Sequence, residues 1–125
     1  MKECLITAEA VLTLSVRPED HFFDRKSAGI SGQKLQKTVV AFTNAGGGEV
    51  VIGVADDKDE PDPSKRWSGL PTIEGFNSLL QAVHILNPSV NVRYEFLKNE
   101  ALKSFALQIF VERSADVNKT DDGKV

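Results

Sequence analysis

Basic side chains recur between residues 25 and 37, and the chemistry open to them is phosphate binding. Lysine and arginine contacts to phosphate groups give affinity for nucleic acid without reading its sequence. A solvated helix face is the commoner explanation of such charges, and Lys26 has the further alternative of an ion pair with Asp24 or Glu19. The candidate phosphate contacts are Arg25, Lys26, Lys34 and Lys37.

Three consecutive glycines at residues 46–48 are a second candidate, because backbone amides in a glycine turn can cradle a phosphate. No Gly-Lys-Ser/Thr sequence follows them, and the order of helix then strand is the reverse of a P-loop, so nucleoside triphosphate binding is not expected. We predict that Gly46, Gly47 and Gly48 end a helix and let a neighbouring segment approach closely. Asn44 is expected to cap the helix end or to hold the turn.

The helix before these glycines and the strand after them must position both the basic side chains and the glycine turn. Leu35, Val39 and Phe42 recur at helical spacing, and Ser31 is the expected N-cap of that helix. The apolar run over residues 50–55 is too short for a helix and rich in β-branched residues. It predicts a strand that is covered on both faces. Asp56 follows where this strand leaves the core.

Residues 19–26 are predicted to form another strand, in which charges stand next to aromatic residues. In an extended chain Phe22, Asp24 and Lys26 share one face, and Phe23 points to the other. An unpaired charge that faces the core is costly. Charges on an inward aromatic face are therefore expected to have a partner or a role.

The rest of the chain supplies a second helix and a hairpin. An apolar stripe over residues 76–86 has helical spacing, and Asn87 and Pro88 end it. Residues 90–96 and 105–111 alternate apolar and polar side chains, as the two half-buried strands of a hairpin do. Residues 1–16 fit either a helix capped by Thr7 or a strand, and we favour the helix. This order predicts the α+β class, with a mixed, mainly antiparallel sheet and two main amphipathic helices packed on it.

Length and composition indicate a single domain. The chain has 125 residues, and its 41% hydrophobic content is enough for a sizeable core. The formal net charge of −3 argues against a strongly basic coat but allows a local basic patch. Cys4 is the single cysteine, which fits a reducing compartment. Without a membrane-length apolar run or a signal pattern, we predict a cytoplasmic protein that does not enter a membrane.

The last residues predict that the domain continues into a longer protein. Asp121, Asp122 and Gly123 form a turn signal, and Lys124 with Val125 reads as the start of a strand. We therefore expect residues 1–125 to be one domain excised from a longer chain, with further domains in the same polypeptide.

The central stretch resembles a known signature. A helix ending AFTNAGGG and a strand reading VVIGVADD resemble the "AFxNxxGG…xIGVxD" pattern of the Schlafen-type AlbA-like domain. Glu19, Asp24 and Lys26 resemble that family's "ExxxxE-F-K" entry, with Asp24 in place of the second Glu and Arg25 in place of the aromatic residue. The final NKTDDGKV resembles the family's tail segment. The resemblance covers residues 17–125.

The resemblance implies two kinds of function. Most bacterial members are described as DNA-binding domains, found in transcriptional regulators and helicase-related proteins. In Schlafen members three carboxylates form a metal-dependent site that cleaves RNA. Carried over, those carboxylates are Glu19, Asp24 and Asp56, and the implied ion is Mg²⁺ or Mn²⁺, which prefer hard oxygen ligands.

We therefore predict a nucleic-acid-interacting domain, with DNA or RNA as partner, in a larger regulatory or defence protein. The first alternative is a metal-dependent endoribonuclease that uses Glu19, Asp24 and Asp56. The second is a self-association module that forms a homodimer, since related folds pair so that nucleic acid lies in the groove between them. The net negative charge weighs mildly against simple duplex binding, because electrostatics supplies most non-specific affinity.

Overall fold

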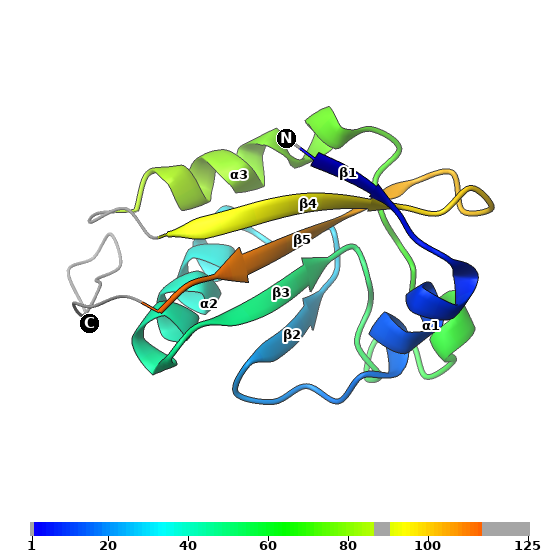
Figure 1. Cartoon of the computed structure of the whole chain (residues 1–125), viewed down its shortest axis with the longest axis horizontal. Coiled ribbons are helices and arrows are strands. Elements are labelled where there is room, and N and C mark those ends of the chain that lie inside the picture. Colours follow the sequence, from blue (N-terminus) through cyan, green and yellow to red (C-terminus); the bar gives the residue numbers. More distant parts are fainter. Residues whose placement is uncertain (1, 87–90, 114–125) are drawn as a thin grey trace.

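A five-stranded mixed sheet forms the centre of the molecule, in a computed structural model that describes residues 2–86 and 91–113. The strand order is β1-β4-β5-β3-β2 (Figure 1). The pairs β1/β4 and β2/β3 are parallel, whereas β3/β5 and β4/β5 are antiparallel. The predicted α+β class with a mixed sheet is confirmed, although parallel and antiparallel pairings share the described sheet equally. The strands are β1 (Lys2–Leu5), β2 (Phe23–Lys26), β3 (Gly48–Ile52), β4 (Val92–Lys98) and β5 (Phe105–Val111).

Helices cover the two faces of this sheet unequally. Two of them, α2 (Gly32–Ala45) and α3 (Asn77–His84), pack against one face and form the larger core with β3, β4 and β5. The short helix α1 (Ala8–Val16) packs on the opposite face, where Leu14 joins a smaller core around Phe23 and Val51 (Figure 1). Two single turns, η1 (Pro63–Lys65) and η2 (Ile73–Phe76), lie in the connection from β3 to α3. The predicted apolar stripe of residues 76–86 is confirmed as the buried side of η2 and α3.

The ends of α2 follow the predicted local chemistry. The side chain of Ser31 accepts a hydrogen bond from the backbone N–H of Lys34 at 3.2 Å, which caps the first turn. Gly46 ends the helix with a left-handed φ of 110°, and Gly47 follows with φ 96°. A Cβ on Gly48 would overlap the Phe42 ring. The glycines thus serve the turn and close packing.

The strand after the glycines is interior to the sheet, because it pairs with β2 on one side and β5 on the other. Val50, Val51 and Ile52 are fully buried, which confirms that both faces are covered. The strand ends at Ile52 rather than at residue 55. Gly53 has φ 108°, which extended backbone does not allow, and the chain leaves the sheet there.

The sequence of residues 1–16 fitted either a helix or a strand, and the structure contains one of each. β1 pairs with β4, and α1 follows after Thr7, whose side chain accepts from the Ala10 N–H at 3.1 Å. The predicted helix is therefore correct, and it is preceded by an edge strand. The predictions for residues 87–90 and 114–125, including the C-terminal strand start, lie outside the described residues. Within residues 2–86 and 91–113, no helix has the length and hydrophobicity needed to cross a membrane.

Candidate nucleic-acid interface

The edge strand β2 divides its side chains between the two faces of the sheet. Phe23 is fully buried and Arg25 is 4% exposed, both on the face that carries α1. Asp24 and Lys26 point the other way, toward α2, and are half-buried. Phe22 is 54% exposed. Asp24 and Lys26 therefore share a face opposite Phe23, as predicted, but the strand begins at Phe23 and not at Glu19, so Phe22 lies outside it, and the buried charge of the strand is Arg25.

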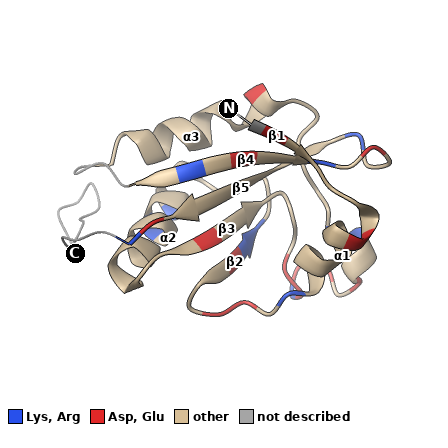
Figure 2. Ribbon diagram, viewed as in Figure 1, with Lys and Arg blue, Asp and Glu red and all other residues tan. Residues whose placement is uncertain are grey.

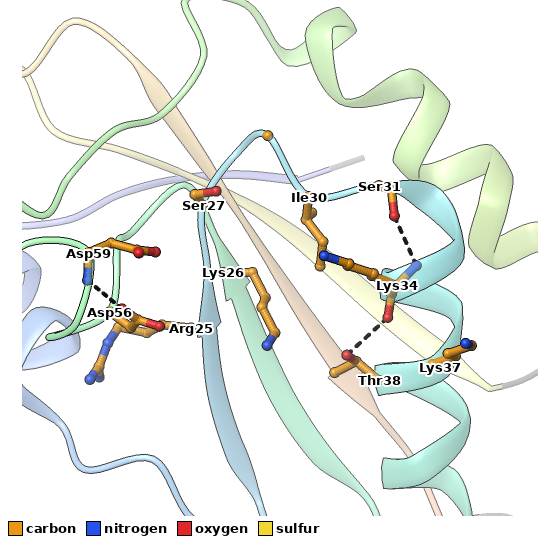
Figure 3. Close-up of a pocket in the computed structure, with 11 residues that line it drawn as sticks. Arg25, Lys26, Ser27, Ile30, Ser31, Lys34, Lys37, Thr38, Asp56 and Asp59 are labelled. Atoms are coloured by element: carbon orange, nitrogen blue, oxygen red, sulfur yellow. Dashed lines mark hydrogen bonds between the residues drawn. The ribbon is translucent and has the colours of Figure 1, made fainter.

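A pocket of about 560 Å³ opens between β2 and α2. Lys26 reaches it from the strand, and Lys34 and Lys37 reach it from neighbouring turns of the helix. Lys26 and Lys34 extend into the space between the two elements in Figure 3. Basic positions on both elements are coloured blue in Figure 2. All four predicted basic residues thus line one pocket, and the three lysines can turn their amines toward it.

Arg25 does not join them through its charge. Its guanidinium points away from Lys26 in Figure 3, and its Nη1 donates hydrogen bonds to the carbonyl oxygens of Leu14, at 3.0 Å, and Arg17. These carbonyls belong to the end of α1, and Arg25 itself is buried. The guanidinium of Arg25 therefore holds α1 against the sheet and is not presented to a ligand in the pocket.

Two aspartates stand at the far side of the same pocket. Asp56 and Asp59 line it from the loop after β3 (Figure 3). The Asp56 carboxylate accepts hydrogen bonds from the backbone N–H groups of Lys58, at 3.0 Å, and Asp59, at 2.9 Å. Asp56 thus fixes the turn that begins this acidic loop. The pocket carries both signs of charge, with amines toward α2 and carboxylates toward the loop.

Glu19 and Asp24 come together beside the lysine pocket. They line an adjoining pocket of about 360 Å³, and Thr38 of α2 lines both pockets. The Glu19 carboxylate accepts from the backbone N–H of Arg25 at 3.3 Å, so it covers an outward-facing donor of the edge strand. Asp24 shares a hydrogen bond with Glu19 and forms an ion pair with Lys26 at 3.1 Å.

A three-carboxylate metal site requires that Glu19, Asp24 and Asp56 converge on one point. Glu19 and Asp24 are adjacent, whereas Asp56 lines the other pocket and holds its own turn. Among residues 2–86 and 91–113, no three His, Cys, Asp or Glu side chains are placed to hold one ion. In this arrangement the residues do not fit the Mg²⁺ or Mn²⁺ site that the resemblance implied.

The carboxyl of Glu19 has an unusual proton affinity that predicts a pH effect on stability. Burial of this carboxyl, and second its hydrogen bond with Asp24, raise the pKa of Glu19 from 4.5 to about 7. The folded state therefore binds this proton more tightly than the unfolded chain does. The stabilisation is complete below pH 4.5 and is lost as pH rises toward 7.

We expect Glu19→Gln to remove that pH dependence. Urea midpoints of the wild-type domain should fall between about pH 5 and pH 8 by more than those of the variant. The difference should stay below about 1 kcal/mol, because Glu19 is more exposed than buried and solvent screens it. Equal falls in both proteins would show that Glu19 titrates normally.

Thr38 and Asp59 are among the pocket residues that the sequence reasoning missed. Thr38 stands one turn after Lys34 on the same side of α2, and its hydroxyl donates to the Lys34 carbonyl at 3.1 Å. Helical periodicity could have identified it from Lys34. Asp59 carries no such signal, because its position depends on the path of an irregular loop. Asn44 lies in the last turn of α2 and is exposed, and its proposed role in the turn stays a prediction.

Comparisons with known proteins bear on the fold and on the family of the chain. No curated protein matches the chain. A solved structure, that of the DIP2311 protein from Corynebacterium diphtheriae, matches 92% of this chain with a TM-score of 0.56 and 15% identity. At that identity the match shows the fold alone, and this chain spans 23% of that protein's chain. The family model described as "Schlafen, AlbA_2" matches residues 19–125. The chain therefore belongs to the Schlafen AlbA_2 family.

Proposed function

We propose that this domain binds nucleic acid through phosphate contacts in the pocket between β2 and α2. The observation that supports this most is the convergence of Lys26, Lys34 and Lys37 from two elements on one pocket. Lysine is a compact positive donor suited to phosphate oxygens, and such contacts give affinity without sequence readout. Family membership supports the same class of partner.

The local charge explains how an acidic chain can bind a polyanion. The net charge is −3, yet these amines stand together while several of the carboxylates lie in the loop after β3. Screening at physiological salt limits the reach of a surface charge to about 8 Å. A phosphate in the pocket therefore experiences the three lysines and the two aspartates at the pocket's far side, whereas acidic residues elsewhere on the surface are largely screened.

The wider role follows from this binding. We propose that the domain is the nucleic-acid-interacting part of a larger regulatory or defence protein, whose other domains supply its output. This chain spans 23% of the DIP2311 chain with which it shares a fold, which is consistent with a module of a longer polypeptide. A homodimer that extends the binding surface is compatible with the proposal.

The endoribonuclease alternative receives less support. It needs a third carboxylate beside Glu19 and Asp24, and Asp56 lies at the other pocket. Metal-assisted cleavage of a phosphodiester depends on an ion held at the scissile phosphate. We therefore place binding ahead of cleavage.

The salt dependence of binding tests the proposal. We expect affinity for a short DNA duplex to fall on raising salt from about 0.05 to 0.2 M, with a log–log slope of roughly −2 to −3, since each phosphate contact contributes about −0.9. Single-stranded DNA and RNA should show shallower slopes. Absence of binding to all three probes at low salt, with a dimer in size-exclusion chromatography, would indicate self-association instead.

The same probes distinguish binding from cleavage. Each is incubated with Mn²⁺ or with a chelator and examined for shortened strands. We expect intact probes in both conditions. Metal-dependent cleavage that disappears in Asp24→Ala and Asp56→Ala would replace the binding proposal with the nuclease.

A further inference from the structure

One amine of the lysine pocket already has an anionic partner. Lys26 Nζ lies 3.1 Å from Asp24 Oδ2. The two residues are separated by one position on β2, so the strand geometry itself holds their side chains on the same face. The side chain of Asp24 is 20% exposed and that of Lys26 is 38% exposed. The pair is therefore partly shielded from solvent and open on the lysine side.

Asp24 cannot readily move away from this lysine. The protonated carboxyl of Glu19 donates a hydrogen bond to the Asp24 carboxylate, and Glu19 in turn accepts from the backbone N–H of Arg25 in β2. Phe23 next to it is fully buried and fixes the backbone of the strand. Lys26, in contrast, has a long flexible side chain whose terminal amine can turn toward the pocket. Asp24 is thus the fixed member of the pair and Lys26 the movable one.

We propose that Asp24 competes with phosphate for Lys26 and so lowers the affinity of the lysine pocket for nucleic acid. This inference depends on the proposed function and adds a residue that determines affinity. A phosphate that enters the pocket must either share Lys26 with Asp24 or displace it. Lys34 and Lys37 lie on α2, and within the described residues the ion pair of Asp24 is with Lys26. The two helix lysines act as primary contacts, whereas Lys26 acts as a restrained one.

The competition has a specific signature in a double-mutant cycle. We expect Asp24→Asn to raise affinity for the duplex probe by about two- to fivefold, the range that corresponds to releasing a partly exposed ion pair. In a Lys26→Gln background the same change should have much less effect, because no amine is released. Additive behaviour in the two backgrounds would show that Asp24 acts only through its general charge, and would overturn the proposal.

Asp59→Asn is the matched control for general charge. Asp59 lines the same pocket, and its replacement removes one negative charge without touching the Asp24–Lys26 contact. Its effect on affinity should be equal in the wild-type and Lys26→Gln backgrounds. A dependence on Lys26 as strong as that of Asp24→Asn would contradict the specific role of Asp24.

Two further measurements keep the result interpretable. If Asp24→Asn does not fold, Lys26→Gln and Lys34→Gln are compared in the wild-type background. The first should weaken binding by less than about twofold and the second by several-fold, since an intact phosphate contact contributes somewhat under tenfold at about 0.1 M salt. Equal losses would overturn the competition while leaving the binding site in place. No loss in either variant would instead contradict the proposed function.

Discussion

Replacing Lys26, Lys34 and Lys37 together with glutamine is expected to weaken binding to a DNA duplex by roughly 100-fold at about 0.1 M salt. Two unrestrained phosphate contacts account for most of this loss, and Lys26 adds less because Asp24 holds it. The log–log salt slope should become shallower by about 2. The loss should be similar for probes of different sequence, because phosphate contacts carry no base information.

A charge-matched variant separates a site from a general effect of charge. Lys65, Lys98 and Lys103 are exposed and do not line the lysine pocket, and their joint replacement by glutamine makes the same change in net charge. This control should weaken binding by less than about fivefold, through long-range attraction alone. Fluorescence anisotropy measures both variants, and circular dichroism checks their folding. Equal losses in the two would indicate a diffuse attraction and no defined pocket.

Local chemistry explains why the sequence predicted the region from α2 to β3 well. Ser31 caps α2 through its own side chain, and Gly46 ends the helix with a backbone angle that favours glycine. Both effects operate between residues that are close in the chain. The buried run of β3 can also be recognised from the sequence, because the side chains on both of its faces are apolar. Both of its ends were misplaced: the strand begins at Gly48, inside the predicted glycine turn, and Gly53 interrupts a stretch whose composition alone looks continuous.

The side of the sheet on which each side chain of β2 lies could not be predicted in the same way. Phe22 and Phe23 offer two equivalent apolar faces, and the choice depends on which of them meets the core on the α1 side of the sheet. That core is built from β3, β4, β5 and α1, which are distant in sequence. The same long-range packing buries Arg25 and leaves Lys26 at the pocket. The position of Asp56 relative to Glu19 likewise depends on how β3 ends and where its loop goes.

Replacing Arg25 with alanine is expected to lower the free energy of unfolding by about 3 kcal/mol, because removing a charged donor leaves buried acceptors unsatisfied. The acceptors are the carbonyls of Leu14 and Arg17 at the end of α1, a helix with no basic residue in its last turn. The negative end of a helix dipole favours a cation there. Arg66 donates a hydrogen bond to the carbonyl of Ser15. Two arginines that are distant in sequence, Arg25 and Arg66, therefore satisfy the carbonyls at the end of α1.

Denaturant unfolding of Arg25→Ala measures this loss, and Arg93→Ala is its control. Arg93 is exposed and stacks on Phe110, with its guanidinium carbon 4.4 Å from the ring centroid, so its removal should cost about 0.5–1 kcal/mol. Arg25→Lys should restore part of the loss, since both hydrogen bonds come from the single nitrogen Nη1 and an ammonium also carries several donors on one nitrogen. Nucleic-acid affinity per folded molecule should be unchanged in Arg25→Ala. A variant of normal stability that binds weakly would return Arg25 to the set of phosphate contacts that the sequence predicted.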